Sequence, residues 1–361
     1  MPHPILHTPP HPLLILLSLA LSSPQTTAQP QVRITGQAQG TSYLISYRPS
    51  PNVLPGPIFD SILQSVDRSL SNYNDRSLLS TFNRSSTGIP MDAHLLRVIR
   101  ASQDFSTSSS GAFDITIAPA MTAWGFGPQP ASTLPNTLTL DSIRKQIDFQ
   151  LLLIRNDSLL KRNPLVKIDV NGIAQGYTVD LIAERLETNG ISDYLIELGG
   201  EIRLKGQNPQ GKPWTVGVER PFTPPFAQST AGWIITPDRP AVTTSGVYRN
   251  RRTIEGRSFT HVIDPRTATP VDNDILSVTV MAPDAMTADA VDHTCLVLGR
   301  RKCLRWVSTL PQVDVFIVYR DGRGRIHTRT TDGFPKTSAA DGHANRHPLL
   351  RTGKPKAPPA P

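Results

Sequence analysis

The chain has 361 residues, 38% of them hydrophobic and 18% charged, which is enough for a large buried core and typical of a soluble globular protein. Its formal net charge is +8, but much of the excess follows Pro335, and no basic stripe is interleaved with aromatic residues, so nucleic-acid binding is not expected. The absence of CxxC, HExxH, GxxxxGK[ST] and GxSxG motifs removes the usual support for zinc-ribbon, zincin, P-loop and serine-hydrolase functions.

The first 28 residues are typical of a secretory signal peptide. The apolar run over residues 13–21 is too short to span a bilayer, and residues 26–28 are small enough for cleavage. We therefore expect an exported, periplasmic protein, with an uncleaved N-terminal anchor as the alternative. The rest of the chain is predicted to form one folded domain over residues 29–334 and a basic, proline-rich, disordered tail over residues 335–361.

Hydrophobic periodicity predicts the elements in chain order. Alternating apolar residues predict a strand pair over residues 31–47, and an i, i+4 apolar stripe predicts a helix over 57–70 that begins with proline. A surface loop is expected over 128–140, and further helices over 91–109, 141–147, 172–188 and on both sides of Gly299. Strands are expected over 151–154, 165–170, 194–198, 201–205, 215–218, 233–235, 259–263, 276–281 and 313–319. Strands and helices mix without a regular βαβ rhythm, which predicts an α+β fold with mixed sheets flanked by helices in one compact unit.

The segment over residues 167–182 combines a predicted strand, a polar turn and a helix that begins with small residues. The strand delivers Asp169, and Asn171 suits the N-cap of the helix. Gly172 and Gly176 would allow the backbone and a ligand to approach closely. Unpaired N–H groups at such a helix start can bind an anion, although an ordinary strand–turn–helix has the same pattern.

Other short motifs surround this segment in one order along the chain. They are Gln39-Gly-Thr-Ser-Tyr43, Leu70-Ser-Asn-Tyr-Asn74, Ser80-Thr-Phe-Asn83, Gly111-Ala-Phe-Asp114, Trp124-Gly-Phe-Gly127, Glu197-Leu-Gly-Gly-Glu201, Thr244-Ser-Gly246, His261-Val-Ile-Asp-Pro-Arg-Thr267 and Thr287-Ala-Asp-Ala-Val-Asp-His293. Taken together, the series resembles the FAD:protein FMN transferase (ApbE) family over residues 31–318. The resemblance implies an ApbE-like fold and magnesium-dependent transfer of FMN from FAD to a Thr or Ser hydroxyl of an exported protein, with release of AMP. The acceptor would carry a Ser-Gly-Ala-Thr/Ser-like segment, and the enzyme would meet a membrane only through that acceptor or an uncleaved N-terminus.

The resemblance implies an FAD site built from separate parts of the chain, namely Gln39, Tyr73, Ala112, Phe113, Asp114, Asp169, Gln175 and Ile263. Tyr73 is expected to stack on the isoalloxazine or, alternatively, to cap the core beside a helix end. Asp114 lies in an apolar run and needs a polar partner, which a flavin or a backbone turn would supply. Gln39 and Gln175 depart from the family, which usually has methionine and lysine at these positions, so Gln175 contributes no positive charge to FAD binding.

For the metal, the resemblance implies Mg²⁺ bound by the backbone carbonyl of Gly172 and by Asp289 and His293, which are four residues apart on one helix face. His293 stands where the family has threonine, although magnesium prefers oxygen ligands. Taken alone, the acidic residues would be a solvated helix face. His261 is predicted to steer or deprotonate the acceptor hydroxyl, with Asp292 as a second catalytic residue.

Two other functions fit the same residues: FAD binding without catalysis, and hydrolysis of FAD to FMN and AMP. The chain itself has no segment of the acceptor kind, so self-flavinylation is not expected. Cys295 and Cys303 are its only cysteines. We expect free thiols buried on apolar helix faces, with a disulfide as the alternative that export would permit.

Overall fold

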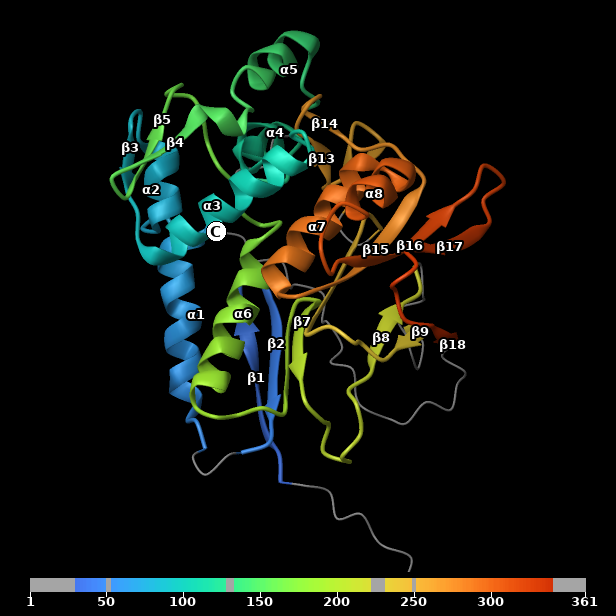
Figure 1. Ribbon diagram of the computed structural model, residues 1–361. Helices are drawn as coiled ribbons and strands as arrows, with labels where there is room; N and C mark the ends of the chain where they lie inside the picture. The colour runs from blue at the N-terminus through green and yellow to red at the C-terminus, as the bar shows by residue number, and fades with distance from the viewer. Residues whose placement is uncertain (1–29, 50–52, 128–132, 222–230, 249–250, 340–361) are drawn as a thin grey trace, which may run out of the picture.

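The structure is a computed structural model that describes residues 30–49, 53–127, 133–221, 231–248 and 251–339 (Figure 1). The predicted signal peptide and most of the predicted tail lie outside these residues. The α-helices of the described part are α1 (Gly56–Leu70), α2 (Leu78–Arg84), α3 (Ala93–Ser108), α4 (Ala118–Ala123), α5 (Thr137–Arg144), α6 (Ala174–Thr188), α7 (Ala285–Leu298) and α8 (Arg300–Val307). No described helix is both long and apolar enough to cross a bilayer.

An eight-stranded sheet, in the order β1-β2-β6-β7-β10-β15-β16-β17, forms the centre of the molecule. Its strands are β1 (Val32–Ala38), β2 (Thr41–Tyr47), β6 (Tyr194–Leu198), β7 (Glu201–Lys205), β10 (Ala241–Gly246), β15 (Ile275–Ala282), β16 (Asp314–Arg320) and β17 (Ile326–Thr330). Each adjacent pair is antiparallel, as are the smaller described sheets. The α+β class is therefore confirmed, with antiparallel sheets in place of the expected mixed ones.

The remaining strands form small sheets at the periphery of the main sheet. They are β3 (Gly88–Pro90), β4 (Leu152–Arg155) and β5 (Ser158–Lys161) in one sheet, β8 (Val216–Glu219), β9 (Ala231–Ile235) and β18 (Ser338–Ala339) in another, and the pairs β11 (Arg251–Ile254) with β12 (Arg257–Thr260) and β13 (Ile263–Asp264) with β14 (Thr269–Pro270). Because β18 pairs with β9, the folded domain continues beyond the predicted boundary at residue 334.

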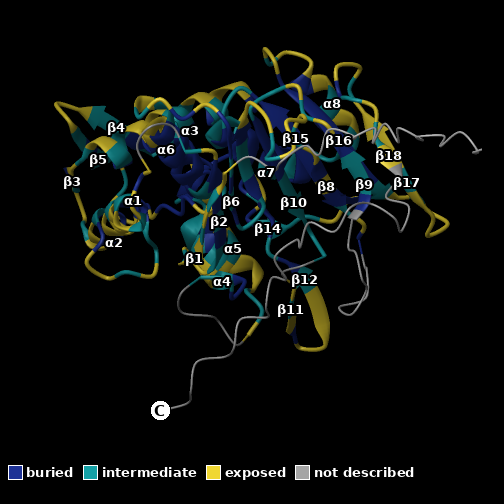
Figure 2. Ribbon diagram, turned by 90° about the horizontal axis from the view of Figure 1, so that it is seen from below, coloured by how far each residue is buried: buried dark blue, intermediate teal, exposed yellow. Residues whose placement is uncertain are grey.

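Helices α1, α6, α7 and α8 cover one face of the main sheet, where α6 and α7 pack side by side (Figure 1). The other face packs against the β8–β9 sheet through a second apolar cluster that includes Val218, Met281 and Phe316. All eight residues of β15 are buried, because this strand is covered on both faces (Figure 2). The α6–α7 layer therefore rests on a rigid support, and polar groups along its seam are held away from water.

The predicted strand over residues 165–170 is absent, because a side chain takes the place of a partner strand. Asn83 accepts the N–H of Ile168 at 2.7 Å and donates to its carbonyl at 2.8 Å. The N–H of Asp169 bonds to the carbonyl of Ile115 at 2.7 Å. The segment is thus extended without belonging to a sheet, and these bonds fix the place of Asp169.

Most other elements differ from their predicted bounds by one or two residues, and two differ more. The expected strand over residues 259–263 is interrupted at His261 and Val262, between β12 and β13. Helix α5 begins at Thr137, inside the expected surface loop, because the side chain of Asn136 accepts the N–H of Thr139 at 2.9 Å and caps the helix.

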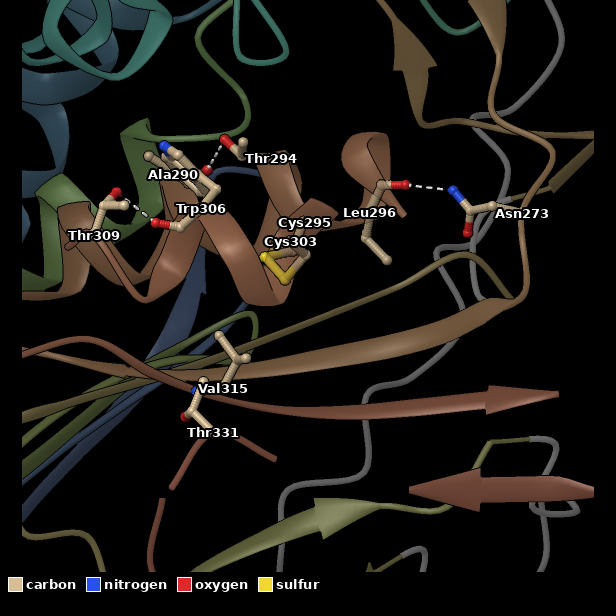
Figure 3. Close-up of a disulfide and its surroundings, with 10 residues drawn as sticks. All are labelled: Asn273, Ala290, Thr294, Cys295, Leu296, Cys303, Trp306, Thr309, Val315 and Thr331. Carbon is tan, nitrogen blue, oxygen red and sulfur yellow. Dashed lines mark hydrogen bonds between the residues drawn. A yellow bond between two sulfur atoms is a disulfide. The ribbon is translucent and has the colours of Figure 1, made fainter. Parts of the chain in front are cut away.

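The expectation of free thiols is wrong, because Cys295 on α7 and Cys303 on α8 form a disulfide (Figure 3). Gly299, with a φ of 72°, turns the chain sharply between the two helices. This turn brings the two Cα atoms to 4.7 Å, within the range that a disulfide requires. Both cysteines are buried, so the bond fastens α7 to α8 inside the core.

Candidate functional site

The predicted metal-binding residues meet where α6 begins against α7. The N–H of Gly176 donates to Oδ2 of Asp289 at 3.0 Å. A Cβ on Gly176 would lie 2.2 Å from the carbonyl oxygen of Ala285, so only glycine allows this approach of the two helices. Gly172 lies against the ring of His293, since a Cβ there would be 3.1 Å from the ring atom Cγ. The fold therefore brings Gly172, Asp289 and His293 together.

The start of α6 is not the open anion site that its sequence suggests. The N–H groups of Ile173 and Ala174 bond to the carbonyl of Val170 at 3.1 and 2.9 Å. The N-cap residue is Ile173 and makes no side-chain cap, so the prediction of Asn171 as N-cap is wrong. The N–H of Asn171 points back to the carboxylate of Asp169 at 2.8 Å instead. The anion at this helix start is the carboxylate of Asp289 on α7, which accepts the N–H of Gly176 in the first turn of α6.

Asp289, Asp292 and His293 have potential ligand atoms that all lie within 4.8 Å of one another. The two aspartates are 1% and 0% exposed, so the alternative of a solvated acidic helix face is wrong. Nδ1 of His293 lies 2.9 Å from Oδ1 of Asp292 and 3.3 Å from Oδ1 of Asp289. Thr243 on β10 donates to the other oxygen of Asp292 at 2.7 Å. We call these three residues of α7 the acidic cluster.

The acidic cluster contains a buried ion pair between His293 and the two aspartates. Burial would lower the pKa of His293, but its contacts with Asp289 and Asp292 outweigh burial and raise that pKa well above the ordinary value. Burial raises the pKa of Asp292, and the bond from His293 partly offsets this rise. At neutral pH the imidazolium therefore faces the carboxylate oxygens that a metal ion would use.

The residues of the acidic cluster fit a divalent cation. Oδ1 of Asp289 is buried and makes no hydrogen bond, and its contact is the ionic one with Nδ1 of His293 at 3.3 Å, which leaves the oxygen available to a metal ion. Carboxylates and a backbone carbonyl such as that of Gly172 suit a hard cation, whereas imidazole suits softer metals. Thr294 cannot replace His293 as a ligand without a change of rotamer, because its hydroxyl donates to the carbonyl of Ala290 at 2.6 Å (Figure 3).

The residues predicted to hold the flavin at 112–114 are buried beside the short helix Ile115–Ile117. The carboxylate of Asp114 accepts the N–H and hydroxyl of Thr116 at 2.8 and 2.7 Å, and the N–H of Phe149 at 2.9 Å. Burial raises the pKa of Asp114 to about 6, and these bonds oppose the rise. Of the two partners considered for Asp114, the backbone turn is thus present, and a flavin contact by this residue stays a prediction.

Two further predicted FAD contacts lie over α6. Gln39 occupies the β1–β2 turn with a φ of 50°, and its amide donates to the hydroxyl of Thr178 at 2.7 Å. Gln175 lies one turn earlier on α6, and its amide nitrogen would be 3.1 Å from a Cβ on Gly199. Tyr73 is 68% exposed, so it does not cap the core, and an aromatic face remains accessible for stacking.

His261 lies between β12 and β13, beside Phe126. Its ring meets that of Phe126 edge-on, with centroids 6.5 Å apart. The indole of Trp124 donates to the carbonyl of Ala268 at 2.8 Å and fastens the turn between β13 and β14. Ala268 has a φ of 56°, a left-handed conformation that glycine adopts more readily than alanine. Ile263 is buried beside it and pairs with Pro270 across the turn.

A cavity of about 430 Å³ opens beside the β11–β12 hairpin rather than at the acidic cluster. Trp124, Phe259 and Thr260 are among the residues that line it. Because Thr260 precedes His261 in the chain, the cavity borders the segment that holds this histidine.

The polar residues of α6 and β7 that lie against α7 were not predicted from the sequence. Asp180 on α6 accepts the N–H groups of Ala285 and Met286, each at 2.9 Å, and the guanidinium of Arg203 on β7 at 2.7 Å. Burial raises the pKa of Asp180 to about 6, against the effect of Arg203. Glu201, on the same strand, is buried and acted on by the charges of the acidic cluster. Asp180 lies in the segment over residues 167–182 and Glu201 ends the motif Glu197-Leu-Gly-Gly-Glu201, but their contacts with α7 join elements far apart in the sequence.

Similarity to known proteins covers most of the chain. The sequence profile of the ApbE family matches residues 39–317. The FAD:protein FMN transferase of Vibrio cholerae is 32% identical over 335 residues, with 91% of this chain and 96% of the relative covered. The FAD:protein FMN transferase of Escherichia coli K12 is 32% identical over 267 residues, with 72% and 75% covered.

Solved structures agree with the sequence comparison. The flavin transferase ApbE from Vibrio cholerae has a TM-score of 0.75 and 31% identity, with 84% of this chain and 98% of that chain covered. The apo form of the flavinyl transferase ApbE from Pseudomonas stutzeri has a TM-score of 0.75 and 31% identity, with 84% and 95% covered. By sequence and by fold, the chain belongs to the ApbE family.

Proposed function

We propose that this protein is an FAD:protein FMN transferase that uses Mg²⁺ to move FMN from FAD to a Thr or Ser hydroxyl of an exported protein. The acceptor oxygen would form the new bond to the FMN phosphorus, the pyrophosphate bond would break, and AMP would leave. The observation that supports this proposal most directly is the acidic cluster of α7, buried against the start of α6 where the family resemblance implies the metal.

In this proposal, Asp289 and the carbonyl of Gly172 hold the metal, with His293 beside them. Mg²⁺, when bound, would neutralise the diphosphate and polarise the phosphorus that is attacked. Asp292, fixed by Thr243 at 2.7 Å, keeps the cluster in place. His261 accepts the proton of the acceptor hydroxyl, since a neutral imidazole is a suitable general base near neutral pH.

The flavin part of FAD would lie over Tyr73, whose exposed ring offers a stacking face. The residues assigned to the remaining FAD contacts are Gln39, Ala112, Phe113, Asp114, Asp169, Gln175 and Ile263. Because Gln175 is uncharged, neutralisation of the diphosphate depends on the metal to a greater degree than it would with a cationic side chain at this position.

We further propose that the protein works in the periplasm on an acceptor with a Ser-Gly-Ala-Thr/Ser-like segment, and that a membrane is involved only through this acceptor or an uncleaved N-terminus. The signal-like first 28 residues support export. The buried disulfide supports it independently, because disulfides persist mainly in oxidising compartments.

The test is incubation of the purified protein with FAD, Mg²⁺ and an acceptor peptide, followed by assays for AMP, free FMN and peptide-bound flavin. The proposal requires AMP and flavinylated peptide in equal amounts, and loss of both with EDTA. AMP with free FMN would indicate a pyrophosphatase, and bound but unconsumed FAD would indicate a flavin-binding protein without activity. Absence of FAD binding in the presence of Mg²⁺ would exclude all three functions.

We expect His293→Thr to raise magnesium affinity at pH 6 by more than about fivefold. A fivefold change corresponds to about 1 kcal/mol, the net worth of an ordinary hydrogen bond, so the expected effect is larger than the loss of one such bond. The raised pKa of His293 means that its proton competes with the metal for the two aspartates. Wild-type affinity should therefore increase as the pH rises, and the threonine variant should lose this dependence. Calorimetric titration of both proteins with MgCl₂ between pH 6 and 9 measures the effect. A wild type that consumes FAD faster with zinc than with magnesium would contradict the choice of metal.

A further inference from the structure

Glu201, the first residue of β7, is a buried carboxylate with a free oxygen. The residue is 5% exposed, and its Oε2 has no hydrogen-bond partner. An unpaired carboxylate oxygen in a protein interior loses its hydration without compensation, so it normally has a donor or a cation. None of the described residues supplies one to Oε2, and the role assigned to the acidic cluster does not account for it.

The strand geometry directs Glu201 toward the α6–α7 seam. Residues two apart on a strand share a face, and Arg203 reaches Asp180 on α6 at 2.7 Å from that face. The neighbouring strand β10 pairs Val242 with Ile202. The next residue of β10, Thr243, donates to Asp292 on α7. Glu201 therefore lies among the side chains that contact the acidic cluster from the sheet.

Gly199 leaves room for this carboxylate at the cluster. A Cβ on Gly199 would lie 3.2 Å from Oε2 of Glu201 and 3.1 Å from the amide nitrogen of Gln175 on α6. Gly199 has a φ of 69°, so its turn favours glycine independently. The turn thus admits Glu201 Oε2 and the Gln175 amide to the same small region at the start of α6.

The electrostatics give the same location. After burial, the charges of Asp289 and Asp292 are the strongest influences on Glu201, and they raise its pKa well above the ordinary value. Three buried carboxyl groups consequently face one imidazole, and a divalent cation among them would allow all three to be ionised.

We propose that Glu201 is a positioning residue of the metal site, which accepts a hydrogen bond from a water molecule on the cation that Asp289 holds; this inference rests on the metal dependence of the proposed function. Glu201 is not among the side chains whose ligand atoms lie within 4.8 Å of one another, so it acts through water and not as a direct ligand. Carboxylates in this position orient the bound water and the ligands around a metal.

Glu201→Gln tests the proposal, because glutamine keeps the shape and removes the charge. Without metal, the variant should be at least as stable as wild type, since glutamine is uncharged and has the shape of a protonated glutamate. Its affinity for Mn²⁺, used alone as a spectroscopic probe, should fall by about 10- to 100-fold, the usual effect of losing an outer partner of a metal site. Thermal unfolding with and without MnCl₂ and an EPR titration measure these two effects.

Glu197→Gln is the matched control, at the other end of the same turn. Oε1 of Glu197 accepts the N–H of Gly200 at 3.0 Å, so its role is in the turn itself. The control should retain wild-type Mn²⁺ affinity.

Unchanged Mn²⁺ affinity in Glu201→Gln, or a metal-free variant that is less stable than wild type or unfolded, would overturn the proposal and assign Glu201 a structural role. Failure of the proposed function itself has a separate signature. In that case wild type would show neither metal-dependent stabilisation nor FAD consumption.

Discussion

Replacing Asp289 with asparagine should lower FMN transfer by at least about 100-fold while the protein stays folded. The amide oxygen of asparagine can still accept the N–H of Gly176, which Oδ2 of Asp289 accepts at 3.0 Å. The variant loses the anionic oxygen that the metal requires, and loss of a metal-dependent electrostatic contribution typically costs several kcal/mol of transition-state stabilisation. AMP release with an acceptor peptide measures activity, and circular dichroism measures folding.

Alanine at position 289 should abolish activity as well, but asparagine is the cleaner change because alanine would leave the N–H of Gly176 buried without an acceptor. Asp284→Asn is a suitable control on the same helix. The Asp284 side chain caps α7 by accepting the N–H of Thr287 at 2.7 Å, a bond that asparagine can also make. Wild-type transfer by a folded Asp289→Asn protein would show that the metal is held elsewhere or is not used.

Gly176→Ala should destabilise the fold by about 1–3 kcal/mol and weaken metal binding without changing any charged group. The new Cβ would lie 2.2 and 2.6 Å from the carbonyl oxygen and carbon of Ala285 and 2.8 Å from Cβ of Asp289. Two of these are backbone atoms and cannot rotate away, so α6 and α7 must separate and the acidic cluster must move from the start of α6. Urea unfolding and a magnesium titration measure the two effects.

Gly56→Ala provides the comparison, since a Cβ at the start of α1 meets nothing within 4 Å. Alanine is the better helix former, so this variant should be as stable as wild type or slightly more stable. Equal unfolding free energies for Gly176→Ala and wild type would mean that the α6–α7 contact is looser than the structure indicates.

Much of the fold could be predicted from the sequence where the signal was local. The i, i+4 stripe of residues 57–70 became α1 almost to the residue, and β6 and β7 have the predicted bounds. The strand predicted over residues 165–170 did not form, because the backbone of Ile168 bonds to the side chain of Asn83, 85 positions away in the sequence, and not to a partner strand. Hydrophobic periodicity cannot predict that a distant side chain will take the hydrogen bonds of a partner strand.

The candidate site was predicted in the same uneven way. Asp289 and His293 were assigned to the metal through the family resemblance, and their four-residue spacing placed them on one helix face. Their burial, the cation that His293 forms between two aspartates, and the proximity of Glu201 depend on β7 and β10 lying beneath α7. The disulfide was misjudged for a related reason, since only the turn at Gly299 brings Cys295 and Cys303 together.

The bond between Gly176 and Asp289 also bears on the order in which the protein matures. It joins residues 113 positions apart, and contacts of such long range form late because the loop must close before they stabilise anything. Until α7 packs against α6, the N–H of Gly176 lacks the carboxylate acceptor that Asp289 provides. The site is therefore among the last parts of the molecule to assemble, and only a chain completed through α7 can bind the metal there.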